Sequence, residues 1–140
     1  MVYPQHKLRQ NNGTAVVDYD ADTIKVMIVT SAYTYSAAHD FKDDITNEVS
    51  GTNYTAGGTA VAGVTFALDG DNAEFIHNDI TWSQSGAGFS NGRVFIWYKD
   101  TGTASTSPLI MRMTEGADFG NVAGDLVLDG SATTGVLNFT

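Results

Sequence analysis

Three aspartates stand close together before the middle of the chain, where they could hold a metal ion or carry out acid–base chemistry. Asp40, Asp43 and Asp44 belong to the stretch HDFKDDIT, and on a helix residues three or four positions apart share one face. No histidine follows at helical spacing, and the next acidic residue is Glu48. Because the dipole favours acidic side chains at the N-terminal end of a helix, the sequence favours a structural role over a metal site.

The stretch DGDN, residues 69–72, is a second candidate for a cation site, because it begins like a calcium-binding loop. An EF-hand loop needs glycine at its sixth position and glutamate at its twelfth, where this chain has Glu74 and Ile80. Asp-Gly tolerates the positive φ of a tight turn, so the stretch predicts a hairpin. A weak surface calcium site stays open as the alternative.

The three histidines, His6, His39 and His77, lie far apart, and none has the H-x-x-x-H spacing of a zinc site. His77 and Asp79 share one face of an expected strand, which fits an acid–base pair or a polar surface pair, and the second is more common. The chain has no cysteine and no G-x-S-x-G motif. We therefore assign no catalytic residue, cofactor or metal, and we expect the protein not to be an enzyme.

The charge of the chain is uneven along its length. Lys7 and Arg9 are the only Lys, Arg, Asp or Glu residues among positions 1–17, so within the net charge of −9 this segment carries +2 and the rest of the chain carries −11. Such an acidic surface repels nucleic acids and anionic membranes, and neither is expected as a partner. We expect residues 1–17 to form an N-terminal arm that docks on another protein or on a copy of the chain, with a loose tail as the alternative.

The remainder, residues 18–140, has the pattern of a single β domain. Residues 23–30 and 93–99 are rich in β-branched and aromatic side chains, and the second segment is apolar on both faces, which predicts a central strand or a partner contact. Further strands are expected at residues 15–18, 59–68, 73–82, 108–114, 124–128 and 134–139. One short helix is expected at residues 39–46. The sequence thus predicts an all-β fold, a β-sandwich or jelly-roll-like domain of about eight strands with one short helix.

Large aromatic side chains are more numerous than a small sheet requires. Phe89 stands alone in an expected loop at residues 83–92, and Trp97 lies in the expected central strand. Some of these rings must fill the core, but a surplus on one face suits a subunit interface or, as a weaker alternative, carbohydrate binding. Together with the basic arm, they form the candidate interface residues: Tyr3, His6, Lys7, Arg9, Phe89 and Trp97.

Four collinear blocks carry a resemblance to a known family: DTIKVMIVTSAYT, HDFKDDITNEVSGTNYTAGG, DITWS and YKDTGTASTSPLI. They extend over residues 22–110 and resemble the motifs of a family of small structural proteins of tailed bacteriophages. The family has no known catalytic residues. The resemblance therefore implies a building block of the virion, in which residues 41–61 form a helical turn, a short strand and a Gly-Gly turn.

Within that family resemblance, we expect a capsid decoration or cement protein on the outer capsid surface of the virion. Its expected partners are the major capsid protein and two copies of itself in a homotrimer. The alternative is a tail or fibre-associated protein that uses Phe89 to contact host glycan or another tail protein. A third hypothesis is a small glycan hydrolase that uses His77 with Asp79, or the cluster of Asp40, Asp43 and Asp44. The lack of the paired carboxylates typical of such enzymes counts against it.

Overall fold

The computed structural model describes residues 1–130 and 137–139 of the chain, and within them strands predominate. The helical elements in this part are the α-helix α1 (Pro4–Asn12) and the 3-10 turns η1 (Lys42–Asp44) and η2 (Ala104–Thr106). The strands are β1 (Ile24–Thr30), β2 (Thr59–Ala60), β3 (Thr65–Asp69), β4 (Asn72–Ile76), β5 (Ile80–Trp82), β6 (Gly92–Lys99), β7 (Leu109–Phe119), β8 (Leu126–Leu128) and β9 (Leu137–Phe139).

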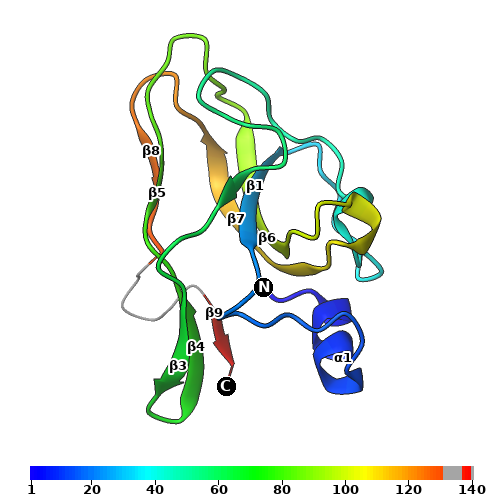
Figure 1. Ribbon diagram of the computed structural model, residues 1–140. Helices are drawn as coiled ribbons and strands as arrows, with labels where there is room; N and C mark the ends of the chain where they lie inside the picture. The colour runs from blue at the N-terminus through cyan, green and yellow to red at the C-terminus, as the bar shows by residue number, and fades with distance from the viewer. Residues whose placement is uncertain (131–136, 140) are drawn as a thin grey trace.

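The strands β1 and β6 form the middle of a four-stranded antiparallel sheet of order β2-β1-β6-β7 (Figure 1). They pair along their whole length, from Ile24 opposite Lys99 to Thr30 opposite Gly92. Both strands carry apolar side chains at nearly every position, so both faces of this sheet must be covered. The predicted central position of residues 93–99 is confirmed.

One face of the sheet packs against the small antiparallel sheet β5–β8, which Figure 1 shows standing opposite it. Phe95 and Trp97 of β6 share a buried core with Trp82 of β5 and Leu128 of β8. The rings of Trp82 and Phe95 stack with their centroids 6.1 Å apart. This two-layer packing confirms the predicted all-β, sandwich-like fold.

The opposite face of the same sheet is covered by the N-terminus and a loop. Met27 of β1 and Ile96 and Tyr98 of β6 pack there against Tyr3 and Tyr33. This second cluster explains why β6 is apolar on both sides: each face belongs to a separate core.

A third sheet, β3-β4-β9, extends from the end of the β5–β8 layer (Figure 1). The predicted hairpin is confirmed, since Asp69 of β3 pairs with Asn72 of β4. The expected strand at residues 73–82 is interrupted, because the amides of His77 and Asn78 bond to the carbonyls of Gly130 and Ala62, each at 2.8 Å. The expected strand at residues 59–68 is split as well, and of the one at 134–139, residues 134–136 lie outside the described part.

The N-terminal residues, expected to form an arm that docks on a partner, instead form a helix packed on their own domain. Pro4 begins α1, where a missing amide costs nothing, and Gly13 ends it with φ 68° and a bond from its amide to the carbonyl of Arg9. The amide of Tyr3 bonds to the carbonyl of Ile110 at 3.0 Å, and Val2 bridges to Met111 on β7. The first residues therefore continue the main sheet.

The helix predicted at residues 39–46 is wrong apart from the three residues of η1. The Asp44 carboxylate accepts hydrogen bonds from the amides of Asp40 and Phe41, which holds a tight turn. Phe41 bridges to Pro108, and the amide of Leu109 bonds to the carbonyl of Asp40 at 2.9 Å. Because these main-chain groups bond to the start of β7, they are not available to a longer helix.

The strand predicted at residues 15–18 is also wrong. The side-chain amide of Gln10 donates to the carbonyl of Val17 and accepts from its amide, so a helix side chain takes the place of a neighbouring strand. Among the described residues, no helix has the length and apolar character needed to cross a membrane.

Candidate functional site

The candidate interface residues of the N-terminal segment make most of their contacts inside their own chain. Tyr3 has no exposed surface, and its hydroxyl lies 2.8 Å from that of Tyr33. His6 is buried, with Nε2 2.8 Å from the hydroxyl of Tyr19. Lys7 is exposed. Two of these side chains therefore attach the helix to the domain, whereas Lys7 points to solvent.

Arg9 fixes the outer side of the helix. Its guanidinium bonds to both carboxylate oxygens of Asp40 and lies 3.8 Å from the centroid of the Phe41 ring. An arginine held by two parallel bonds and a stacked ring is a specific anchor rather than a mobile charge. The prediction of an arm that reaches a neighbour through Tyr3, His6 and Arg9 is thus corrected, because these three side chains bond to residues of their own chain.

Burial determines the protonation of the polar groups beneath α1. It lowers the pKa of His6 to about 4, with a smaller contribution from the charge of Arg9. It raises the pKa of Tyr3 and of Tyr19 above the ordinary value for a phenol. His6 is therefore neutral at pH 7, and its Nε2 shares a hydrogen bond with the Tyr19 hydroxyl.

Phe89 and Trp97, the remaining candidates, are core residues. Phe89 is buried, its ring meets that of Tyr54 edge-on at 5.6 Å, and its amide donates to the side-chain oxygen of Asn121 at 3.0 Å. Trp97 has no exposed surface. Neither ring can contact a partner or a glycan in this fold, so their assignment to an interface is corrected.

His77 and Asp79 do not form an acid–base pair. Nδ1 of His77 bonds to the carbonyl of Asn78 at 2.7 Å, and Nε2 accepts from the indole of Trp97 at 3.1 Å. The Asp79 carboxylate instead accepts from the amide of Gly130 at 3.0 Å. Burial lowers the pKa of His77, and the ring serves as a neutral hydrogen-bonding group within the core.

The acidic residues around Asp40 are separated in the same way. Asp40 pairs with Arg9, and Asp44 accepts from main-chain amides. Within residues 1–130 and 137–139, no three His, Asp or Glu side chains gather as metal ligands. The calcium alternative at residues 69–72 involves the side chains of Asp69 and Asn72, which lie outside the described ones.

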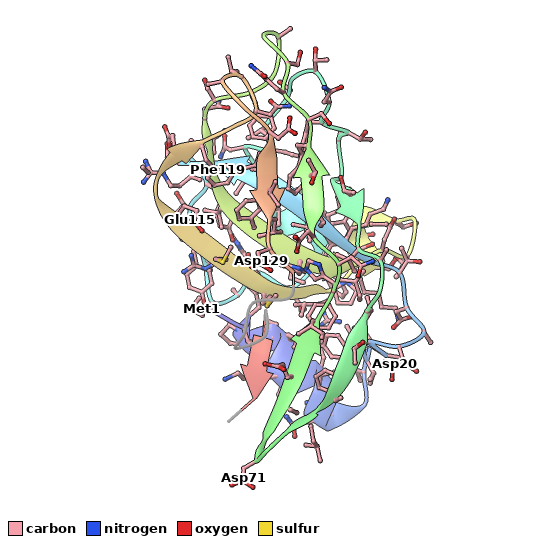
Figure 2. The ribbon with its side chains drawn as sticks, turned by 90° about the vertical axis from the view of Figure 1, so that its left-hand side faces the viewer. Met1, Asp20, Asp71, Glu115, Phe119 and Asp129 are labelled. Atoms are coloured by element: carbon pink, nitrogen blue, oxygen red, sulfur yellow. The ribbon has the colours of Figure 1, made fainter. Side chains whose placement is uncertain are left out.

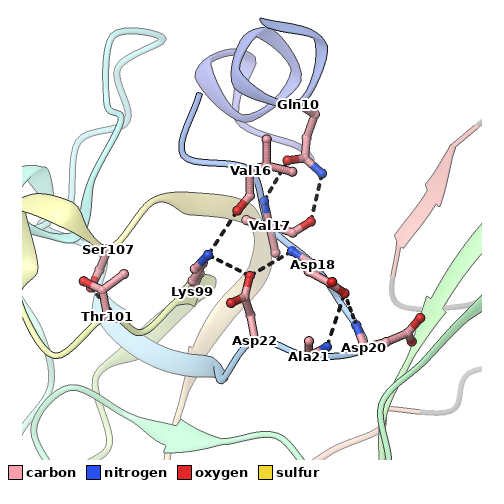
Figure 3. A network of polar contacts seen from close by, with 10 residues as sticks. All are labelled: Gln10, Val16, Val17, Asp18, Asp20, Ala21, Asp22, Lys99, Thr101 and Ser107. Carbon is pink, nitrogen blue, oxygen red and sulfur yellow. Dashed lines mark hydrogen bonds and ion pairs between the residues drawn. The ribbon is translucent and has the colours of Figure 1, made fainter. Parts of the chain in front are cut away.

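A polar network that the sequence did not reveal joins α1 to the main sheet (Figure 3). The Asp18 carboxylate accepts from the amides of Asp20 and Ala21, while Asp22 accepts from the amide of Asp18. Asp22 also pairs with Lys99 at 2.8 Å. Alternate aspartates at positions 18, 20 and 22 resemble cation ligands, but the carboxylates of Asp18 and Asp22 are used to hold a turn.

A surface hollow of about 510 Å³ lies beside this turn, between α1 and β3. Lys7, Asn11 and Asp20 line it together with Tyr19 and Phe66, whose rings stack at 4.7 Å. Several of its polar atoms are already engaged, since both ends of the Gln10 amide bond to Val17. The side-chain amide of Gln10 is therefore not available to a ligand in this hollow.

Comparison with protein-family models, with curated proteins and with solved structures finds no match to this chain. Functional inference therefore depends on the geometry of the chain and on the sequence blocks described above.

Proposed function

We propose that the protein is a structural component of a tailed-phage virion, and specifically a capsid decoration or cement protein. The observation that carries the proposal is how the four sequence blocks are used. Their charged and amide side chains mostly bond to one another or to the main chain, so the blocks encode a rigid scaffold. A chain whose distinctive residues build a scaffold suits a structural role better than a catalytic one.

The link between Glu48 and the YTAGG stretch is the clearest example. The Glu48 carboxylate accepts a bond from the hydroxyl of Tyr54 and another from the amide of Gly57, each at 2.6 Å. The same hydroxyl accepts from the amide of Ile28 in β1 at 3.0 Å. Burial raises the pKa of Tyr54, so the phenol stays protonated and available as a donor. Glu48, the YTAGG stretch and β1 are thereby joined through the Tyr54 hydroxyl and the Glu48 carboxylate.

Two ion pairs fasten β1 to the end of β6. Lys25 pairs with Asp100 at 2.6 Å, and Asp22 pairs with Lys99 at 2.8 Å. The hydrogen bonds that Asp100 accepts from Lys25 and from the amide of Gly102 hold its pKa below the usual value for an aspartate. These charges belong to the DTIK and YKDTG blocks, so the two blocks are joined by ion pairs within the fold.

In this role, the exposed surface of the domain binds the capsid. A shell protein that binds the assembled capsid and not its free subunits stabilises the capsid by mass action. We place the protein on the outer capsid surface, bound to the major capsid protein, as a homotrimer.

Cryo-EM of the parent virion tests the proposal. We expect ordered density for this fold at symmetry-related positions over the head, at high copy number. Heads stripped of the protein should release DNA at a lower temperature, and adding back the purified protein should restore the original temperature. Density confined to the tail, or particles without the protein, would overturn the capsid assignment and favour the tail alternative.

A further inference from the structure

The strand β7 departs from β6 in its second half. Gly92 of β6 faces Phe119, but Val94 faces Thr114, so β7 carries extra residues between these two pairs. Arg93 spans this bulge, with bonds to the Asp118 carboxylate at 2.8 Å and to the carbonyl of Gly116 at 3.1 Å. A bulge bends a strand locally, and here residues 115–118 leave the ladder with β6 before β7 pairs with it again at Phe119.

An apolar groove of about 550 Å³ lies between this bent part of β7 and the strand β8. Buried Phe95 and Leu128 line it, and Phe119 stacks on Phe95 with the ring centroids 4.6 Å apart. Met113 and Val127, exposed by 38% and 54%, also line it. Apolar side chains thus form a continuous lining that solvent reaches in the free chain.

One side of the groove is formed by β8, whose outer edge has no neighbouring strand among the described residues. In the described part of the chain, β8 pairs with β5 alone, from Ile80 opposite Leu128 to Trp82 opposite Leu126. An open edge offers main-chain donors and acceptors to a further strand. An extended segment could therefore bond to β8 and place alternate side chains into the groove.

The rim of the groove is acidic. Figure 2 shows Glu115 and Phe119 on β7 and Asp129 just after β8, and Glu115, Asp118 and Asp129 all line the groove. Of these acidic side chains, Asp118 pairs with Arg93 at 2.8 Å. The groove therefore combines an apolar floor with a negative border.

We propose that this groove receives an extended segment of a partner protein that carries alternating apolar and basic side chains. The segment adds to β8 as a strand, its apolar side chains cover Phe95 and Phe119, and its basic side chains meet Glu115. A second copy of the chain fits less well, because its net charge is −9. The proposal stands on the groove itself and does not depend on a place in a virion.

A synthetic peptide of alternating valine and lysine, about nine residues long and capped at both ends, is the probe. Fluorescence anisotropy should show saturable binding to the intact protein. Val127→Lys and Glu115→Lys should each weaken binding by about ten-fold, since they block the groove or reverse its charge. Leu68→Lys and Asp71→Lys make the same chemical changes on the exposed β3–β4 hairpin and should leave the affinity unchanged. No saturable binding, or equal losses in the hairpin variants, would overturn the proposal.

Two further peptides separate strand addition from charge attraction. A peptide with glutamate in place of lysine should not bind, because both charges are then negative. A peptide with N-methyl groups on its central residues keeps the charge but loses the main-chain donors, and its affinity should fall by about ten-fold. Equal affinity for the methylated and unmethylated peptides would rule out pairing with β8.

Discussion

The indole nitrogen of Trp97 donates a hydrogen bond to Nε2 of His77 at 3.1 Å, and both side chains are buried. Nδ1 of the same ring bonds to the carbonyl of Asn78 at 2.7 Å, so both ring nitrogens have partners. Trp82 provides a natural contrast, because its indole nitrogen is buried and has no hydrogen-bond partner among the described residues. Two tryptophans in one core thus differ in whether the N–H is satisfied.

Replacing each tryptophan by phenylalanine should expose this difference. Both changes remove part of an indole, but Trp97→Phe also leaves Nε2 of His77 without a donor. Trp97→Phe should therefore lower the free energy of unfolding by about 1–3 kcal/mol more than Trp82→Phe. Urea unfolding followed by circular dichroism measures both values. Equal losses would show that the Trp97–His77 bond contributes little.

The two buried histidines predict a loss of stability in mild acid. Burial lowers the pKa of His6 to about 4 and also lowers that of His77. A histidine in the unfolded chain is protonated with a pKa near 6.5, so below that pH the unfolded state binds protons that the folded state does not. The contribution of these histidines to the free energy of unfolding is therefore fully present above pH 6.5 and decreases as the pH falls. For His6 the loss should reach about 3 kcal/mol at pH 4.

Unfolding free energies measured from about pH 7.5 down to pH 4 test this dependence. His6→Gln retains a side chain that can hydrogen-bond to the Tyr19 hydroxyl and removes the titrating ring. The variant should show a shallower decline than the wild type over this range. A wild-type profile that is flat between pH 6.5 and pH 4 would contradict a neutral, buried His6.

Tyr3 should be essential for the stability of the domain. Tyr3→Ala empties a fully buried position and should cost about 3–5 kcal/mol. Tyr3→Phe removes only the bond to Tyr33, whose hydroxyl also lies 3.1 Å from Nδ1 of His39, and should cost about 1 kcal/mol. Leu8→Ala on the exposed side of α1 is the control and should change stability by less than about 0.5 kcal/mol. A loss in Tyr3→Ala no greater than in Leu8→Ala would mean that the N-terminus does not pack on the sheet.

Local sequence signals predicted the core strands but not the packing of the N-terminus. The apolar runs of β1 and β6 and the Asp-Gly turn after β3 were readable, because each depends on neighbouring residues alone. The basic residues Lys7 and Arg9 favour an arm that docks on a partner, although Pro4 and Gly13 mark the start and end of a helix. Helix signals were present there, but only the fold shows that Tyr3 fills a core position.

Contacts between distant segments account for the other differences. The bridge from Phe41 to Pro108 replaces the helix expected at residues 39–46, and no local pattern encodes it. The groove beside β8 likewise depends on the bulge that Arg93 spans in β7. Aromatic content alone does not distinguish a core from a surface, which is why the sequence predicts Phe89 and Trp97 as interface residues although both are buried.

Gly58 is a position where a single added methyl group should lower stability. Its φ is +78°, and a Cβ there would overlap the carbonyl oxygen of Val26 in β1. Gly13 at the end of α1 has a similar φ of +68° but nothing within 4 Å of an added Cβ. Gly13→Ala should therefore show the cost of the left-handed backbone alone, about 1 kcal/mol. Gly58→Ala should lose about 1–3 kcal/mol beyond that, because the edge strand β2 must move away from β1. Thermal unfolding of the two variants provides the comparison. Equal losses of stability would show that the turn before β2 can accommodate a Cβ at position 58 without displacing β1 or β2.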